Sequence, residues 1–194
     1  MAGAPPGPRK RQQRADEILD AAAALFVEKG VAATSIDDIV ERAGVAKGTF
    51  YHYFQDRTAM LEGLRERYAQ SFADCAAQAT DACCPRDWDA RLHAWIAAVA
   101  EGYVSSYALH DAIFHDPAVC HRCSMGELVV VQHLAALIAG GCEAGIWTAD
   151  DPVATAVCMF YGLHGMVDEA LATDDDTAKV VPRLSRLYSN MLRA

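Results

Sequence analysis

The 194-residue sequence contains no apolar run near the roughly 20 residues that a membrane-spanning helix needs. Its basic N-terminal residues are not followed by an apolar stretch, so we expect no signal peptide. Common catalytic motifs are also missing, since the chain has no P-loop, no Gly-x-Ser-x-Gly and no His-Glu-x-x-His. We therefore expect a cytoplasmic protein that has no contact with membranes and is not an enzyme.

The cysteines do not form a pattern typical of a disulfide framework. There are seven, an odd number, and Cys83 and Cys84 are adjacent. Secreted domains that depend on disulfides usually carry an even number at regular spacings. A reducing compartment therefore fits this chain better than secretion.

Charge is distributed unevenly along the chain, whose formal net charge is -9. Up to Arg57 the basic and acidic residues balance at eight each, and the remainder carries 9 Lys and Arg against 18 Asp and Glu. Residues 1–14 contain four basic residues and no acidic one, after a start rich in proline and glycine. We predict a disordered basic arm at residues 1–11, either a plain solvated tail or an arm that binds phosphates.

Three helices are expected in the first third of the chain. Residues 15–29 place apolar side chains on one face. A Ser-x-x-Asp capping pattern at residues 35–38 opens a second, short helix that ends at Gly44. Lys47 to Tyr53 form a third helix after a tight turn. This order predicts a helix-turn-helix.

The remainder of the chain also has helical periodicity, and no segment has the alternation of a strand. Pro85 ends one long helix, and an Asp-Pro pair provides both N-cap and first position of another. The fold class is therefore predicted as all-α. The expected helices cover 57–80, a stretch beginning at Asp87, 128–138, 152–171 and a last helix at 180–191.

The third expected helix has the composition of a surface that approaches another backbone closely. Small residues at its start leave amide groups and a hydroxyl available to phosphate oxygens, and Lys47 adds a positive charge. In a helix-turn-helix, the side chains facing outward would be Tyr51 and His52. The side chains packing inward would be Val45, Phe50, Tyr53 and Phe54. The alternative is that the whole segment is a buried hydrophobic hairpin.

Residues 30–61, GVAATSIDDIVERAGVAKGTFYHYFQDRTAML, closely resemble the N-terminal signature of TetR/AcrR-type bacterial transcription regulators. Val40 stands where alanine is common in that family, and Arg57 where lysine is common. The matching positions are Thr34, Ser35, Ile39, Ala43, Gly44, Val45, Gly48, Thr49, Tyr51, Tyr53, Phe54 and Arg57.

The resemblance implies a DNA-binding domain at residues 12–57 and a helical ligand-binding and dimerisation domain at 58–194. Base readout would come from Thr49, His52 and Lys47. The residues expected to contact double-stranded operator DNA are Thr34, Ser35, Ala46, Lys47, Gly48, Thr49, Tyr51, His52 and Arg57.

The same resemblance implies a homodimer that pairs through its last two helices. Apolar faces at 153–167 and 180–191 suit this role, although they would equally suit an intramolecular core. Two recognition helices in successive major grooves would read half-sites about 34 Å apart, or a multiple of that spacing. We expect a repressor.

Members of this family release DNA when a small molecule binds the C-terminal helices, so we expect an apolar or aromatic effector. Any single candidate for its pocket could instead belong to the core. The candidates are Trp95, Tyr103, Tyr107, Phe114, Met125, Trp147, Met159, Phe160 and His164.

The segment at residues 110–123 supports an alternative, a metal-sensing or thiol-redox-sensing regulator. Its histidines and cysteines are ligand types suited to zinc or copper(I). No second Cys-x-x-Cys or His-x3-His pair lies at a finger-like spacing, so we expect no metal and no cofactor. The residues of this alternative are His115, Cys120, His121 and Cys123.

Overall fold

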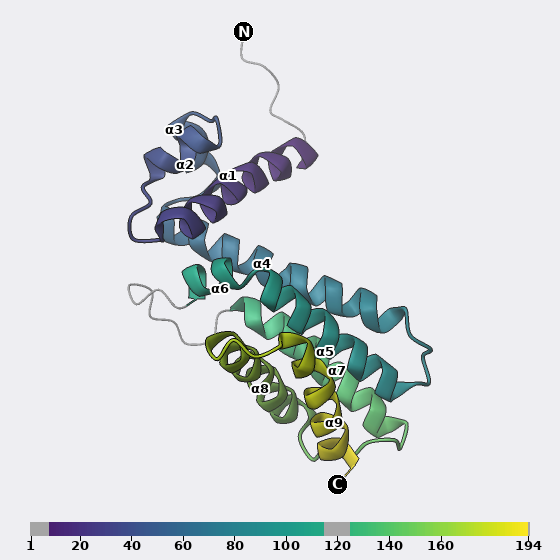
Figure 1. The fold of residues 1–194 in the computed structure, drawn as a ribbon. Coiled ribbons are helices and arrows are strands. Elements are labelled where there is room, and N and C mark those ends of the chain that lie inside the picture. The colour runs from purple at the N-terminus through teal and green to yellow at the C-terminus, as the bar shows by residue number, and fades with distance from the viewer. Residues whose placement is uncertain (1–7, 115–124, 194) are drawn as a thin grey trace. The chain divides into compact units, whose positions relative to one another are not determined.

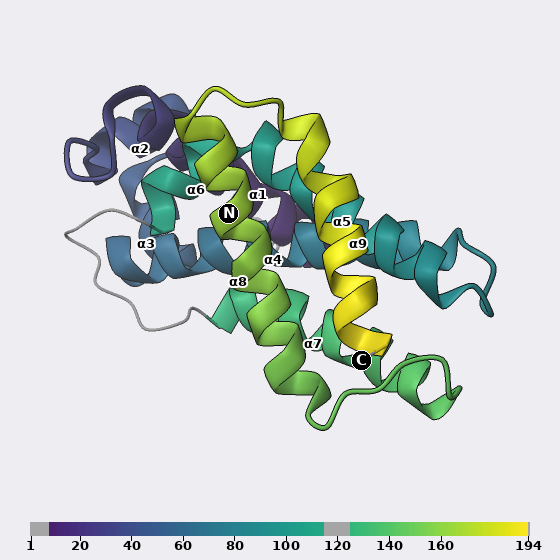
Figure 2. The same ribbon diagram turned by 60° about the horizontal axis from the view of Figure 1, so that its bottom comes forward.

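The computed structural model describes residues 8–114 and 125–193, and all regular secondary structure within these two ranges is helical (Figures 1 and 2). The chain divides into two compact units, with one boundary after Arg65 and the other between Tyr107 and Ala108. Over the described ranges, no helix is both long enough and apolar enough to cross a membrane. The all-α fold predicted from the sequence is confirmed.

The first unit contains the predicted helix-turn-helix. Its third helix has the bounds that the sequence predicted. Its first helix begins earlier than expected, because residues 8–11, assigned to a disordered arm, are already helical. The elements of this unit are α1 (Pro8–Lys29), α2 (Ile36–Arg42), α3 (Lys47–Tyr53), the start of α4 (Arg57–Asp81) and most of α6 (Tyr107–Phe114).

Local signals determine where α2 begins and ends. At its start, Ser35 accepts a hydrogen bond from the backbone N–H of Asp38, and the Asp38 carboxylate accepts one from the backbone N–H of Ser35. At its end, Gly44 adopts a φ of 63°, and the following Val45 N–H donates to the Val40 carbonyl at 3.0 Å. A positive φ favours glycine, so this residue permits the tight turn between α2 and α3.

The second unit contains the remainder of α4 and most of the hydrophobic core. Asp87 and Asp151 cap two of its helices with their carboxylates, as the sequence predicted, and Pro152 follows the second cap. The elements of this unit are α5 (Trp88–Ser105), α7 (Met125–Glu143), α8 (Pro152–Ala172), η1 (Thr177–Lys179) and α9 (Val180–Arg193).

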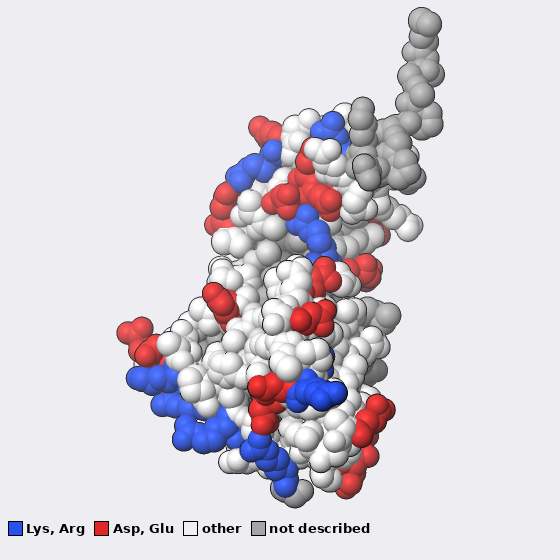
Figure 3. Space-filling model, turned by 90° about the vertical axis from the view of Figure 1, so that its right-hand side faces the viewer, with Lys and Arg blue, Asp and Glu red and all other residues white. Residues whose placement is uncertain are grey.

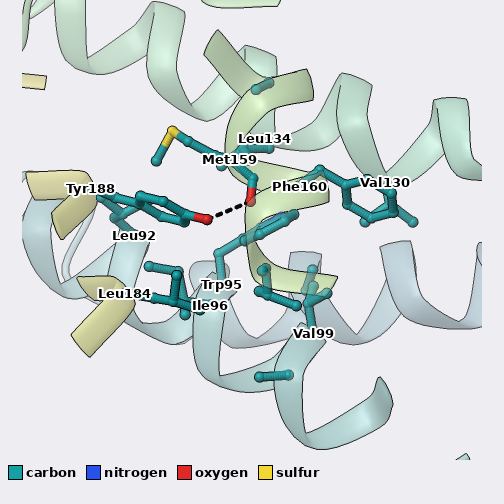
Figure 4. Packing of buried hydrophobic residues seen from close by; sticks show 14 of the residues in the cluster. Leu92, Trp95, Ile96, Val99, Val130, Leu134, Met159, Phe160, Leu184 and Tyr188 are labelled. Carbon is teal, nitrogen blue, oxygen red and sulfur yellow. Dashed lines mark hydrogen bonds between the residues drawn. The ribbon is translucent and has the colours of Figure 1, made fainter. Parts of the chain in front are cut away.

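The core of the second unit lies where α5, α7, α8 and α9 meet (Figure 4). Trp95 and Leu134 are completely buried there, and Met159 is 1% exposed. The Tyr188 hydroxyl donates to the Met159 carbonyl at 2.6 Å, which ties α9 to α8 inside this core.

Two boundaries differ from the prediction. The segment at residues 110–123, to which no helix was assigned from the sequence, is helical as far as Phe114, because α6 continues to that residue. Helix α7 is longer than the expected 128–138, since it runs from Met125 to Glu143. The periodicity of α7 is weak over glycine and alanine residues, so sequence patterns place its ends poorly.

Close packing of two aromatic rings depends on glycine at the end of α7. A Cβ added at Gly141 would collide with the ring of Trp147, and one added at Gly140 would lie 2.7 Å from the ring of Trp88. These two rings pack edge to face, with their centroids 5.9 Å apart. The glycine pair therefore allows α7 to accept both tryptophans.

We predict that Gly141→Ala lowers the free energy of unfolding by about 1 to 3 kcal/mol, because the added methyl group overpacks the site. Gly48→Ala is the control, since no described heavy atom lies within 4 Å of its added Cβ and it lies outside the two helices expected to pair in a dimer. The control is expected to raise stability by up to about 1 kcal/mol through helix propensity. Denaturant unfolding at one fixed protein concentration measures both. A Gly141→Ala protein as stable as the wild type would contradict this account of the packing.

Candidate nucleic-acid interface and ligand pocket

Helix α3 presents one buried side and one exposed side. Phe50 is completely buried, whereas Tyr51 is 50% exposed and His52 is exposed. At the start of the helix, Ala46, Lys47 and Gly48 are exposed, and Thr49 is half-buried. This orientation agrees with the sequence prediction for Phe50, Tyr51 and His52, and it leaves a lysine and two aromatic rings facing solvent.

Thr34 lies in a different environment from the one expected. Its side chain is 2% exposed, and its hydroxyl donates to the Gly30 carbonyl at 2.8 Å. Its backbone N–H donates to the Val31 carbonyl at 3.2 Å. Both polar groups are therefore used in the connection between α1 and α2, so Thr34 is not available as a phosphate ligand and instead positions the start of α2.

Ser35 and Arg57 are also engaged within the domain. The Ser35 hydroxyl lies 2.6 Å from the Asp38 carboxylate, as part of the N-cap of α2, but the residue is exposed. The guanidinium of Arg57 donates to the Val31 carbonyl, which links the start of α4 to the connection between α1 and α2. Arg57 thus holds the domain together, and Ser35 remains at the surface.

Ion pairs join the three helices of this domain. Lys47 on α3 pairs with Asp37 on α2 at 2.7 Å, and this hydrogen bond raises the pKa of Lys47. Lys29 on α1 pairs with Asp38 at 2.9 Å. Hydrogen bonds from Ser35 and Lys29 hold the pKa of Asp38 well below its usual range. Two neighbouring acids of α2 therefore bind a lysine of α1 and a lysine of α3.

In the second unit, four of the predicted pocket residues form one aromatic cluster. The ring centroid of His164 lies 4.4 Å from that of Tyr103 and 4.3 Å from that of Phe160. Tyr107 packs edge to face on Tyr103 at 5.8 Å. The Tyr103 hydroxyl donates to the Asp168 carboxylate at 2.7 Å. Burial and this hydrogen bond raise the pKa of Tyr103. The cluster combines flat rings with polar groups, of which Tyr103 is buried and His164 and Asp168 are half-buried, a combination that suits small aromatic ligands.

The other predicted pocket residues lie elsewhere. Trp95 and Met159 belong to the main core. Trp147 packs against Trp88, and its indole N–H donates to Asp89 at 3.4 Å. Phe114 belongs to the first unit, where its ring packs against the ring of His110 and under the guanidinium of Arg65. The side chain of Met125 lies outside the described residues.

An open cavity of about 400 Å³ lies on the second unit, between α5, α8, η1 and α9. Its walls are mostly alanine and valine side chains, with Glu101 as the acidic residue among its lining residues. None of the predicted pocket residues lines it. It is a second candidate location for a small molecule, but it provides fewer polar groups than the aromatic cluster.

Helices α8 and α9 expose apolar side chains on one side each, and Figure 2 shows the two helices next to each other at the front of the view. On α9, Leu184 and Tyr188 point into the core, whereas Leu187 is 54% and Met191 43% exposed. The predicted apolar face of α9 therefore divides into a buried and an exposed stripe. The exposed apolar residues of α8 are Val153, Val157 and Tyr161.

The proposed metal or redox segment lies outside the described residues, since His115, Cys120, His121 and Cys123 all fall within 115–124. Among the residues that the structure describes, no group of three or more potential ligands could hold a metal ion.

Two residues of these sites were missed by the sequence reasoning. Asp168 lies four residues after His164 on α8, a spacing that places both on one helix face and could have been noticed. Asp37 carries no such signal, because pairing with Lys47 depends on how α2 and α3 pack.

Comparison with known proteins is consistent with this arrangement. Residues 18–64 match the family model described as bacterial regulatory proteins, tetR family. The transcriptional repressor KstR2 of Mycolicibacterium smegmatis is 39% identical over 59 residues, which are 30% of this chain and 29% of that protein. The regulator AcrR of Shigella flexneri is 31% identical over 132 residues, 64% of this chain and 58% of the relative. The chain thus matches less than two thirds of either relative.

A solved structure supports the fold over almost the whole chain. The transcriptional regulator FadR of Bacillus subtilis, in complex with stearoyl-CoA, aligns with a TM-score of 0.75 and 17% identity, over 90% of this chain and 97% of that one. The helix-turn-helix geometry, the family-model match and the named relatives lead to one conclusion: residues 18–64 form a DNA-binding domain of the tetR family of bacterial regulatory proteins.

Proposed function

We propose that the protein is a dimeric repressor that binds operator DNA through α3 and leaves it when a small apolar or aromatic molecule binds the second unit. The observation that carries this proposal is the exposed side of α3. Lys47, Tyr51 and His52 face solvent on a helix whose other side is held by the completely buried Phe50. A rigid helix with small residues at its start fits the major groove.

The contacts can be assigned by exposure. Lys47 and Ser35 would bind phosphates, Tyr51 would pack on the sugar-phosphate backbone, and Thr49 and His52 would read bases. The small exposed residues Ala46 and Gly48 would let the backbone approach the DNA closely. Arg57 and Thr34 would act indirectly, by holding α2 and α4 in position.

The dimer would form through α8 and α9. These two helices expose several large apolar side chains to solvent, and pairing two copies of the chain would bury them. A two-fold symmetric dimer places two copies of α3 on one DNA duplex, which is how such regulators read two half-sites.

The effector would bind at the aromatic cluster around Tyr103. Helix α4 belongs to both units, since it starts beside α3 and ends in the second unit. Within the first unit, the Arg65 side chain donates to the Ile113 carbonyl of α6 at 2.7 Å. A ligand that moved the α5 and α6 junction at Tyr107 would therefore displace α4, and it would lower DNA affinity by favouring the displaced state.

Operator binding tests the DNA contacts. DNA is first selected from a random pool with the wild-type protein, and affinities are then measured by fluorescence anisotropy. We expect Tyr51→Ala and Lys47→Ala each to weaken binding about tenfold, through loss of a backbone contact and of a phosphate-binding charge. Lys179→Ala in η1 is the matched control and should bind normally. Unchanged affinity in both α3 variants would refute the assignment of this helix.

The dimer interface is tested by adding a charge to an exposed apolar position. Leu187→Asp should convert the dimer into monomers, because a carboxylate placed in an apolar interface would lose its hydration without a partner. Light scattering after size-exclusion chromatography measures the mass. Val27→Asp on α1, where the side chain is 50% exposed, is the control and should leave the mass unchanged. A Leu187→Asp protein that stays dimeric would place the interface elsewhere.

The effector site is tested with Tyr103→Phe, which removes only the hydroxyl that donates to Asp168. Aromatic compounds that release the wild-type protein from DNA are found first by screening. We expect the variant to bind DNA normally and to require about tenfold more of such a compound for release, since one buried polar contact is lost. If Glu101→Gln, in the open cavity, reduced the response and Tyr103→Phe did not, the effector would bind in that cavity instead.

A further inference from the structure

The charges of the DNA-binding domain are unusual for a protein that binds a polyanion. Residues 12–57 contain five Lys and Arg residues and eight Asp and Glu residues, and Arg9, Lys10 and Arg11 at the start of α1 only bring the charges into balance. Figure 3 shows acidic and basic side chains interspersed on the face that it presents. Attraction between positive side chains and phosphates provides most of the non-specific affinity of DNA-binding proteins. This domain has little positive charge to offer.

Each of the five basic side chains already has a partner inside the domain. Arg14 pairs with Glu17 at 2.6 Å, and Arg42 pairs with Glu28 at 2.6 Å. Lys29 pairs with Asp38 on α2, and Arg57 donates to a backbone carbonyl. The remaining one is Lys47, at the start of α3, whose partner is Asp37.

The Lys47 and Asp37 pair differs from the others by its position. It joins the exposed start of α3 to the first turn of α2, and both side chains are well exposed, at 52% and 71%. Asp38, in contrast, is required for the capping box, so its charge has a structural use. Asp37 lies one residue earlier and has no part in that cap, so its carboxylate can be removed without removing the N-cap of α2.

We propose that Asp37 is a specificity-determining residue, which holds Lys47 and opposes the binding of DNA that lacks the operator sequence. This inference rests on the proposed function. On any DNA, Lys47 must leave Asp37 to reach a phosphate, and the carboxylate then faces the negative backbone. Base contacts made by α3 on the operator offset this repulsion, whereas random DNA offers no such compensation. Asp37 thus reduces binding to both kinds of DNA and makes the base contacts decisive.

The test compares Asp37→Asn with Glu41→Gln, a matched control on the same helix. Glu41 is exposed, and its removal changes the net charge by the same amount without touching the Lys47 pair. Affinities are measured by fluorescence anisotropy on two DNAs, a random-sequence duplex of about 20 bp and DNA selected by the wild-type protein. Each is measured at about 50 mM and about 300 mM salt, because salt weakens the electrostatic part of the binding.

We expect Asp37→Asn to bind the random duplex about threefold tighter or more at the lower salt, from the loss of one negative charge close to the backbone. The gain should be larger than that of Glu41→Gln and should shrink at the higher salt. The ratio of selected to random affinity should fall. In a Lys47→Met background the effect of Asp37→Asn should be reduced, because part of it acts through the released lysine.

Equal gains from Asp37→Asn and Glu41→Gln, or no gain from Asp37→Asn, would overturn the inference while the proposed function stands. If the wild type and Asp37→Asn both fail to retain any DNA, the proposed function is wrong and this inference falls with it. Circular dichroism and thermal unfolding of each variant verify that α2 remains folded, so a change in affinity can be attributed to charge.

Discussion

The burial of Phe50 is the interaction on which the DNA-binding domain depends. A helix of seven residues is not stable alone in water, so α3 exists only because it packs against its neighbours. Phe50 is completely buried, and the centroid of its ring lies 5.7 Å from that of the Phe54 ring. Once this ring is inside, the helical period places Tyr51 and His52 outside, and Lys47 is exposed as the first residue of the helix. One apolar side chain therefore decides which residues can meet DNA.

A second constraint follows from the lack of excess positive charge in the domain. Its helices are joined by exposed ion pairs, such as Lys29 with Asp38 and Lys47 with Asp37. Exposed pairs of this kind contribute little to stability and are weakened by salt. They do, however, occupy the same lysines that a phosphate would attract. Under the proposed function, the carboxylates of the domain would compete with DNA phosphates for these lysines, and the side chains of α3 would carry the selectivity.

Features that depend on local interactions could be predicted from the sequence, whereas features that depend on packing between distant segments could not. The bounds of α3 and the caps at Ser35 and Asp151 were predictable, because capping and a positive-φ glycine are local effects. The burial of Thr34 was not, since it depends on the chain folding back so that the hydroxyl reaches the Leu25 carbonyl of α1 as well as the nearby Gly30 carbonyl. Pocket residues were predicted in part. Tyr103 and His164 meet because α5 and α8 pack together, whereas Trp147 and Phe114, chosen for the same aromatic character, lie in other environments.

We propose that α3 reads DNA as part of a symmetric dimer. The most direct test is selection of bound duplexes from a fully random pool by the purified protein, followed by sequencing. We expect enrichment of two related half-sites in inverted orientation, with centres about 34 Å apart or a multiple of that spacing. Recovery of sequences no different from the starting pool, with binding that salt removes equally for all of them, would contradict it.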